Sequence, residues 1–510
     1  MRRGRVYLVG AGPGDPGLLT LRGREALRRA EVVIHDHLVH PRVLDHAPPD
    51  AERVAMGKIG HAHQHSQEEI NRALIEAARA GRTVVRLKGG DPAIFGRLGQ
   101  EAGALARAGI PFEIVPGVTA ASGAAAYAGF PLTDRACSPS VTLVTGHRRS
   151  DGGDGPAIDW DALARAGGTL VVYMGVRRLP EMARALVQGG RAPDTPVALV
   201  RRATFPDQAV VTGTLADIAD RVREAGAGAP ALVVVGEVVR LRETLSWLDR
   251  NPLWGKRILV TRAAHQAGEL SALLRERWAE PVELPLIELR PCGHTSGVET
   301  ALRRLFAYDW VIFSSANAVR FTFERLGALG LDARAFGAAR VCAVGAKTAE
   351  ALERRGIRPD VVPARYVAEA LVEALASRAE LRGATVLIPR AREAREVIPA
   401  ELERMGARVE VLPIYENVRP ALHPPEGLEA LRDANLDMIT LASSSAARNY
   451  VEVCREVGAD PGRVPCAVIG PATRRTADAL GLPVAVMPER YTLRDLVDAM
   501  EAYFAARPDR

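Results

Sequence analysis

Short apolar segments rich in valine alternate with helical patterns along the whole chain. Segments of the first kind are Glu31–His35, Thr83–Leu87, Ser140–Val144, Thr169–Tyr173 and Ala231–Val235. Strands that alternate with helices are typical of layered α/β domains. The pattern therefore predicts the α/β class, with several lobes in a chain of 510 residues.

The alternation is interrupted once, in the segment Trp247–Lys256, and a new strand pattern starts at Arg257. We place a domain boundary near Arg250 and expect one domain at 1–249 and another at 256–510. The segment between them is short and carries two tryptophans, so we expect it to pack rather than to move freely.

The second half contains two pairs of similar segments. Asp309–Val319 resembles Asp437–Ala447, and Val341–Thr348 resembles Cys466–Thr473. Each of the four reads as a strand, a small polar loop and the start of a helix. Such helix starts can bind anions, so the pairs predict two similar lobes with loops suited to anionic ligands.

Composition narrows the function classes. Hydrophobic residues make up 47% of the chain, but no run of eighteen is apolar, so no membrane span or membrane partner is expected. The N-terminus leads straight into a strand without the apolar core of a signal peptide. The five cysteines are scattered and include no Cys-x-x-Cys pair, which indicates a reducing cytoplasm. The net charge of +6 is spread along the chain, so nucleic-acid binding is not expected.

The segment Val6–Leu21 reads as a buried strand, a glycine loop and a helix start. Pro13 alone separates Gly12 from Gly14, whereas the dinucleotide fingerprint has two residues between its second and third glycines. A proline also removes an amide donor where a pyrophosphate would need one. The loop therefore predicts a ligand other than a dinucleotide.

Three later segments occur in a recognisable order after this loop: Val84–Pro92 with Phe95-Gly96-Arg97, then Val115–Ala120, then Val172–Gly175. From about Val6 to Trp247 the chain resembles the tetrapyrrole methylases, specifically uroporphyrinogen-III C-methyltransferases. The resemblance implies a two-lobed fold with S-adenosyl-L-methionine bound between the lobes. The residues that match the cofactor contacts of the family are Pro13, Gly89, Gly90, Asp91, Ile94, Thr119, Ala120, Met174 and Ala203.

The resemblance also implies catalytic residues. A methylated pyrrole ring is cationic and must lose a proton, and Asp36 matches the base proposed in the family. Lys58 matches the proposed proton donor. The alternatives are a strand-end cap for Asp36 and a solvated loop lysine for Lys58. His61, His63 and His65 have poor spacing for a metal site, and no metal is expected.

From about Lys256 to Phe504 the chain resembles uroporphyrinogen-III synthase, notably in Leu387–Ala391 and Leu412–Glu416. The resemblance implies two α/β lobes, with the second inserted at roughly 291–416, and no cofactor. Helix starts and hydroxyls can hold the carboxylates of hydroxymethylbilane. The candidates are Ser314, Ser315, Asn317, Lys347, Thr348, Ser443, Ser444, Ser445 and Thr473. Helix capping is the alternative for each of them.

Tyr415 matches the tyrosine that is proposed in the synthase family to protonate the leaving hydroxyl, and its alternative is packing on a strand. Together the halves predict a bifunctional enzyme that forms uroporphyrinogen III and methylates it twice to precorrin-2. No dinucleotide-binding module precedes Val6, so we expect no dehydrogenase or chelatase activity. The family suggests a homodimer through the methylase half. Two alternatives stay open, namely a later cobalamin-pathway precorrin methyltransferase fused to the synthase, and a C-terminal half that is a non-catalytic binding module.

Overall fold

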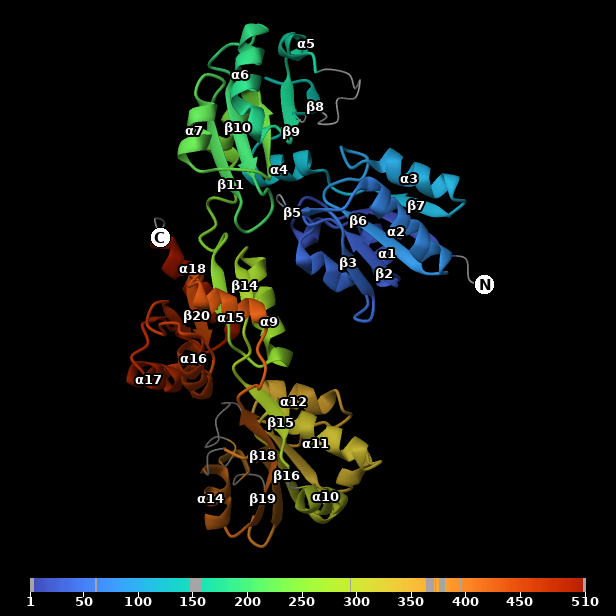
Figure 1. Ribbon diagram of the computed structural model, residues 1–510. Helices are drawn as coiled ribbons and strands as arrows, with labels where there is room; N and C mark the ends of the chain where they lie inside the picture. The colour runs from blue at the N-terminus through green and yellow to red at the C-terminus, as the bar shows by residue number, and fades with distance from the viewer. Residues whose placement is uncertain are drawn as a thin grey trace. The chain divides into compact units, whose positions relative to one another are not determined.

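The computed structural model describes residues 4–59, 62–146, 158–293, 295–363, 371, 373–375, 381–393 and 397–507. The chain forms two compact units (Figure 1). The first contains the residues up to Lys256, together with Arg277–Glu280 and the residues from Phe504 onward. The second contains Arg257–Glu276 and Pro281–Tyr503. No helix in the described part of the chain has the length and apolar character needed to cross a membrane.

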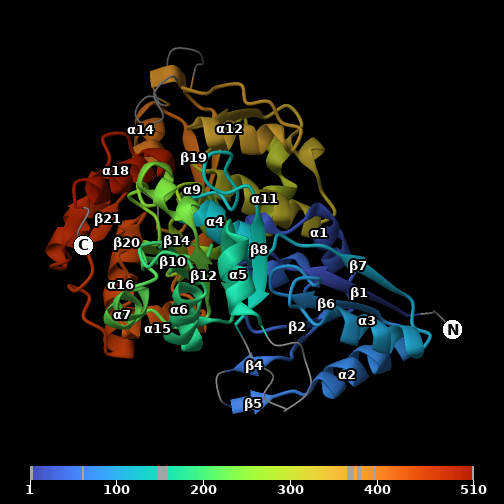
Figure 2. The ribbon, with the colours of Figure 1, turned by 90° about the horizontal axis from the view of Figure 1, so that it is seen from above.

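The first lobe of the first unit is a wholly parallel sheet in the order β3-β2-β6-β1-β7. Helices α2 and α3 cover one face and α1 covers the other (Figures 1 and 2). Burial on both faces explains why the central strands β1, β2 and β6 are largely apolar. The elements are β1 (Arg5–Gly10), α1 (Leu21–Arg28), β2 (Val32–His35), β3 (Glu52–Ala55), α2 (Gln67–Arg79), β6 (Thr83–Lys88), α3 (Leu98–Arg107) and β7 (Phe112–Val115).

The second lobe is a mixed sheet in the order β11-β10-β12-β9-β8. Strands β8 and β9 are parallel, but the other pairs are antiparallel, and β10 and β11 are joined directly as a hairpin. The elements are α4 (Ala120–Ala128), β8 (Val141–Thr145), α5 (Trp160–Ala166), β9 (Thr169–Tyr173), α6 (Leu179–Gln188), β10 (Pro196–Arg201), β11 (Ala209–Thr214), α7 (Ile218–Glu224), β12 (Ala231–Val235) and α8 (Arg242–Leu245).

Four aromatic side chains form a cluster in the first unit, which we call the aromatic cluster. The ring of Tyr127 on α4 lies 5.8 Å from Trp247, 6.5 Å from Trp254 and 5.7 Å from Trp278, centre to centre. The Trp247 indole also donates a hydrogen bond to the carbonyl of Ala126 (2.9 Å). Both tryptophans of the 247–256 segment are therefore packed, as the sequence led us to expect.

The second unit contains two further sheets. Four strands of the first run parallel, in the order β14-β13-β20-β21-β22 with β14 at the edge. Its apolar core lies largely between these strands and α15 and α16. The elements are β13 (Arg257–Val260), α9 (Ala264–Glu276), β14 (Glu280–Glu283), α15 (Pro425–Arg432), β20 (Met438–Leu441), α16 (Ser444–Val457), β21 (Cys466–Val468), α17 (Pro471–Ala479), β22 (Val484–Val486) and α18 (Leu493–Ala505).

The other sheet, ordered β15-β19-β18-β16-β17, is built entirely from chain that lies between β14 and α15 in sequence. The similar segments noted in the sequence form equivalent pairs of adjacent parallel strands, β16–β17 here and β20–β21 in the other sheet. The predicted two-lobed α/β architecture is thus confirmed for both units. The elements are β15 (Glu288–Pro291), α10 (Thr295–Arg303), β16 (Trp310–Phe313), α11 (Ala316–Ala328), β17 (Arg340–Ala343), α12 (Ala346–Glu353), β18 (Thr385–Ala391), α14 (Val397–Arg404) and β19 (Arg408–Val418).

Candidate functional site

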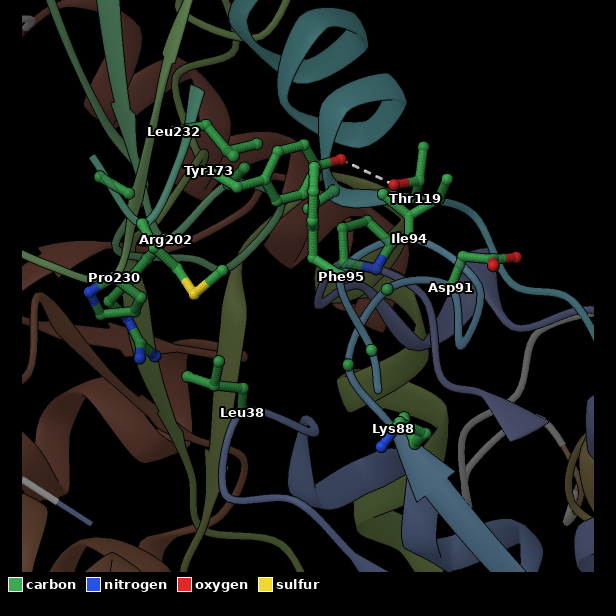
Figure 3. Close-up of a pocket in the computed structure, with 18 of the residues that line it drawn as sticks. Leu38, Lys88, Asp91, Ile94, Phe95, Thr119, Tyr173, Arg202, Pro230 and Leu232 are labelled. Atoms are coloured by element: carbon green, nitrogen blue, oxygen red, sulfur yellow. Dashed lines mark hydrogen bonds between the residues drawn. The ribbon is translucent and has the colours of Figure 1, made fainter. Parts of the chain in front are cut away.

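A cavity of about 290 Å³ lies between the two lobes of the first unit (Figure 3). Loops at the carboxyl ends of the parallel strands of the first lobe form one side of its wall, and residues at the end of β9, after β10 and at the start of β12 form the other. All nine residues expected to contact the cofactor line it, and so does the expected base Asp36. These residues are Pro13, Gly89, Gly90, Asp91, Ile94, Thr119, Ala120, Met174 and Ala203.

Glycine loops approach one another closely beside this cavity. The amide of Gly12 donates to the carbonyl of Gly90 (3.2 Å), and the amide of Gly90 donates to the carbonyl of Gly12 (2.7 Å). A Cβ atom on Gly117 would lie 2.3 Å from the Gly90 oxygen, and one on Gly10 would lie 2.6 Å from it. Side chains are sterically excluded at these positions, so glycine is required for the loops to meet.

Asp91 ties two of these loops together. One carboxylate oxygen accepts from the amide of Ala93 (2.7 Å), and the other accepts from the amide of Gly117 (2.9 Å). The side chain therefore positions the loop after β6 against the loop after β7. Each oxygen has a further lone pair, so Asp91 can still accept from a ligand in the cavity.

Tyr173 and Phe95 line the cavity as well, although the sequence analysis did not single them out. The Tyr173 hydroxyl lies 2.7 Å from the Thr119 hydroxyl and accepts from the amide of Ala121 (3.0 Å), as Figure 3 shows for the first contact. Its ring lies 4.9 Å from that of Phe95. Burial raises the pKa of the Tyr173 hydroxyl. Its position beside Met174, in a segment that we had noted, was the available signal.

Three residues of the cavity wall have a strained backbone conformation. Phe95, Met174 and Arg202 all line the cavity, and their φ angles are 52°, 54° and 45°. Side chains other than glycine rarely adopt this left-handed region, and each instance costs about 1–3 kcal/mol. Strain of this kind tends to be concentrated at functional sites, which supports the cavity as one.

Four charged side chains form what we call the charge network, made of Asp36, Arg86, Lys88 and Glu101. The buried Arg86 guanidinium donates to Asp36 and, from Nε, to Glu101 (3.2 Å). The ammonium of Lys88 donates to the same Glu101 oxygen (2.8 Å), and the Glu101 side chain is 0% exposed. Two cations and two carboxylates thus compensate one another, and Asp36 and Lys88 both border the cavity.

Burial lowers the pKa of the Lys88 ammonium, and the nearby Arg86 charge lowers it further. Glu101 opposes this shift through its charge and its hydrogen bond. The sequence analysis missed Arg86, Lys88 and Glu101. The sequence feature that could have indicated Arg86 and Lys88 is the presence of two basic residues in an otherwise apolar strand, β6.

Lys58, the expected proton donor, begins the short strand β4 (Lys58–Ile59), which pairs with β5 (Ala62–Gln64). Its side chain lies outside the described residues, as do His61 and the side chain of His63. In the part of the chain that is described, no group of His, Cys, Asp and Glu side chains is arranged to hold a metal ion.

In the second unit several predicted substrate contacts cap helices. The hydroxyl of Ser315 accepts from the amide of Ala318 at the start of α11 (3.1 Å). The hydroxyl of Ser443 does the same for Ala446 at the start of α16 (3.1 Å). The equivalent loops of the two lobes therefore start their helices in the same way, and neither capping hydroxyl excludes a bound carboxylate nearby.

The other predicted contacts differ in accessibility. Ser314 is exposed, Ser445 accepts from Arg448 (3.4 Å), and Ser444 donates to the carbonyl of Ala472 (3.2 Å). Thr348 and Thr473 are buried at the starts of α12 and α17. Lys347 is exposed and pairs with Glu269 (3.0 Å).

Tyr415 lies on β19 with its side chain buried. Its hydroxyl is 3.2 Å from the Ser315 hydroxyl, and its ring stacks on Phe321 with 5.1 Å between centres. The structure thus brings together two residues that the sequence analysis named separately. Asn317 follows in the first turn of α11, where its side-chain oxygen accepts from Gln266 (3.3 Å).

Two family models match separate parts of the chain. The model of the family described as tetrapyrrole (corrin/porphyrin) methylases matches residues 5–219. The model described as uroporphyrinogen-III synthase HemD matches residues 268–498.

Among curated proteins, the porphyrin biosynthesis protein HemD of Ruminiclostridium josui is 34% identical over 500 residues, which cover 98% of each chain. The uroporphyrinogen-III C-methyltransferase of Bacillus subtilis is 39% identical over 72% of this chain and 77% of its own. Siroheme synthase 1 of Yersinia enterocolitica is 54% identical, but over only 49% of this chain and 52% of its own. Among solved structures, native uroporphyrin III C-methyltransferase from Thermus thermophilus shares 43% identity with a TM-score of 0.40, covering 46% of this chain and 94% of that one.

Proposed function

The chain belongs to a family in which a tetrapyrrole methylase is joined to a uroporphyrinogen-III synthase, and we propose that it converts hydroxymethylbilane to uroporphyrinogen III and methylates that product twice to precorrin-2. The observation that supports the methylase step most strongly is the convergence of residues from four separate motifs on one cavity. The synthase step is supported by the family match and by the contact between Tyr415 and Ser315.

The cavity suits S-adenosyl-L-methionine as the methyl donor. Its wall combines apolar side chains such as Ile94 and Met174 with glycine backbone that a ligand can approach closely, and Asp91 and Thr119 supply polar atoms. Pro13 borders it and offers no amide to a phosphate. When bound there, this cofactor supplies a methyl group that is activated by its sulfonium sulfur.

Within this proposal Asp36 accepts the proton that a methylated pyrrole ring must release. Arg86 holds the carboxylate by a hydrogen bond, and the buried Glu101 fixes Arg86 in turn. A base that is held in place in this way loses little entropy when it acts. The wall formed by Phe95, Tyr173 and Leu232 limits the access of water to the reacting carbon.

The synthase reaction requires loss of hydroxide from hydroxymethylbilane, and ring closure then inverts ring D. Tyr415 donates a proton to the leaving hydroxyl, and Ser315 orients the phenol. The amides at the start of α11 face the same region through the Ser315 cap, and they can stabilise carboxylates of the substrate. No cofactor is needed for these steps.

We further propose that the enzyme acts in the cytoplasm as a homodimer through its methylase half, with tetrapyrroles as its substrates. The five cysteines are scattered along the sequence and include no Cys-x-x-Cys pair, a pattern typical of proteins of a reducing compartment. Sedimentation of the full chain, and of a variant with a disrupted methylase surface, would test the oligomeric state.

Incubation of the full chain with hydroxymethylbilane, with and without S-adenosylmethionine, tests the whole proposal. We expect uroporphyrinogen III alone without S-adenosylmethionine and precorrin-2 with it. Methylation of another precorrin, but not of uroporphyrinogen III, would favour a later cobalamin-pathway methyltransferase. If the reaction without S-adenosylmethionine gives only the type I isomer, which forms spontaneously, the second unit is a non-catalytic binding module.

A further inference from the structure

Two helices of the second unit carry basic side chains at their starts, and these side chains have no place in the chemistry described so far. Arg262 precedes α9 and follows Thr261, whose buried hydroxyl donates to the carbonyl of Thr440 (2.6 Å) and so anchors the backbone. Arg320 lies one turn into α11. We call Arg262 and Arg320 the arginine pair.

A chain of amide hydrogen bonds connects the two helix starts. Arg262 Nη2 donates to the Gln266 side-chain oxygen (3.4 Å), and Gln266 Nε2 donates to the Asn317 oxygen (3.3 Å). His265 lies in the same group, because its imidazole interacts with Arg262, Arg320 and Asn317. The arginine pair is therefore held on neighbouring elements of one site.

Several guanidinium donors of this pair are shielded from water without a hydrogen bond among the described residues: Nη1 of Arg262, and Nε and Nη2 of Arg320. The nearest carboxylates do not satisfy these donors. Glu269 is 4.0 Å from Arg262 Nη1 and is shared with Lys347, and Glu324 approaches Arg320 at the remaining nitrogen, Nη1, at 3.6 Å. Shielded donors without acceptors are uncommon and destabilising, so each calls for a partner.

A carboxylate is the partner whose geometry fits. Guanidinium groups present parallel donors that match the two oxygens of a carboxylate. Burial lowers the pKa of Arg262 and of His265. In such a setting an added negative charge interacts more strongly than it would in water.

The arginine pair also lies near Tyr415. The Arg320 guanidinium carbon is 4.3 Å from the centre of the Phe321 ring, and that same ring stacks on Tyr415. A carboxylate held here would place its tetrapyrrole within reach of the Tyr415 region.

We propose that Arg262 and Arg320 form a carboxylate clamp for one acetate or propionate side chain of the linear tetrapyrrole. This inference rests on the proposed synthase activity, and it names two binding residues that the family motifs did not indicate. The clamp fixes the position of the substrate relative to Tyr415. Proton donation to the leaving hydroxyl is the role of Tyr415, not of the arginine pair.

The test uses the full chain with Arg262→Gln, Arg320→Gln and the double variant. The matched control is Arg334→Gln, since Arg334 lies in the same lobe as Arg320 with a side chain that is 92% exposed. One measurement is the KM and kcat for hydroxymethylbilane at several salt concentrations. A second is titration calorimetry with uroporphyrin III, an octacarboxylate that does not react, in the presence of S-adenosylhomocysteine. Methylation of supplied uroporphyrinogen III reports that the first unit is intact, and type III product formed at saturating hydroxymethylbilane reports that the second unit, which carries the variants, is folded.

We expect each single variant to raise KM by about 10–100-fold with a smaller change in kcat, because a hydrogen-bonded charge is lost from substrate binding. Arg320→Lys should fall between Arg320→Gln and the unaltered enzyme, since it keeps the charge and loses the fork. If the Arg262 and Arg320 variants have the same KM and the same porphyrin affinity as Arg334→Gln, the clamp is refuted. Type III product from the unaltered enzyme would in that case still support the synthase activity. Absence of type III product from the unaltered enzyme would instead refute the proposed function.

Discussion

Replacing Glu101 by glutamine should destabilise the first unit far more than replacing a surface glutamate does. The Glu101 carboxylate is fully buried and accepts from Arg86 (3.2 Å), Lys88 (2.8 Å) and Gln67 (3.4 Å). Glu101→Gln preserves the shape but leaves two buried cations opposite the single carboxylate of Asp36. Removal of one partner from a buried ion pair costs about 3–5 kcal/mol.

At about 2–4 °C per kcal/mol for a folding unit of this size, the Tm should fall by roughly 6–20 °C. Differential scanning calorimetry of the full chain measures it, and the relevant transition is the one that S-adenosylhomocysteine raises. The control is Glu113→Gln on β7 of the same sheet. Glu113 pairs with Arg22 at the surface, with side-chain exposures of 30% and 52%, so its loss should change stability by about 0–1 kcal/mol.

The stability of the first unit should also depend on pH, in a direction that follows from the pKa of Lys88. Burial lowers the Lys88 pKa below its ordinary value of 10.5, so the unfolded chain binds this proton more tightly. Stability therefore rises with pH from the folded pKa up to about 10.5, where Lys88 is neutral in both states. Loss of Glu101 lowers the folded pKa further, so the deficit of the variant should shrink as the pH rises through this range. Equal Tm shifts for Glu101→Gln and Glu113→Gln, independent of pH, would refute the charge network.

Three further predictions concern the proposed chemistry. Asp36→Asn should slow methylation by about 10²–10⁴-fold with little change in S-adenosylhomocysteine affinity or in cyclisation, and a wild-type rate would remove Asp36 from the mechanism. Gly117→Ala should abolish S-adenosylhomocysteine binding in calorimetry, because its Cβ would lie 2.3 Å from the Gly90 oxygen, whereas Gly99→Ala offers a control with open space around the new atom. Tyr415→Phe should raise the type I fraction of the uroporphyrinogen product on chromatography and leave methylation unchanged; full type III output at low enzyme concentration would assign Tyr415 to packing.

The sequence predicted the cavity wall well because short motifs at strand ends determine it. A glycine loop or a segment such as Gly89–Asp91 has local requirements that are visible in the residues themselves. The α/β class followed from the same alternation, but the antiparallel pairing of β10 with β11 did not, because strands and helices alternate equally in parallel and mixed sheets. The hairpin depends on a short connection that the pattern does not specify.

The charge network and the arginine pair could not be predicted in the same way. Arg86 and Glu101 lie on different elements, and only packing of α3 against the sheet brings their side chains together. Arg262 and Arg320 are 58 positions apart and read individually as ordinary surface arginines. For Ser315 and Ser443 the sequence left capping and substrate binding open, and the structure shows the caps without deciding the second role.

The aromatic cluster has a practical consequence for spectroscopy. It contains three of the five tryptophans of the chain, Trp247, Trp254 and Trp278, with Tyr127 close enough to transfer excitation to them. The intrinsic fluorescence of the protein should therefore be dominated by the first unit. Emission spectra would follow the unfolding of that unit selectively, and Trp278→Phe would reveal how much of the signal depends on a residue outside the continuous N-terminal stretch.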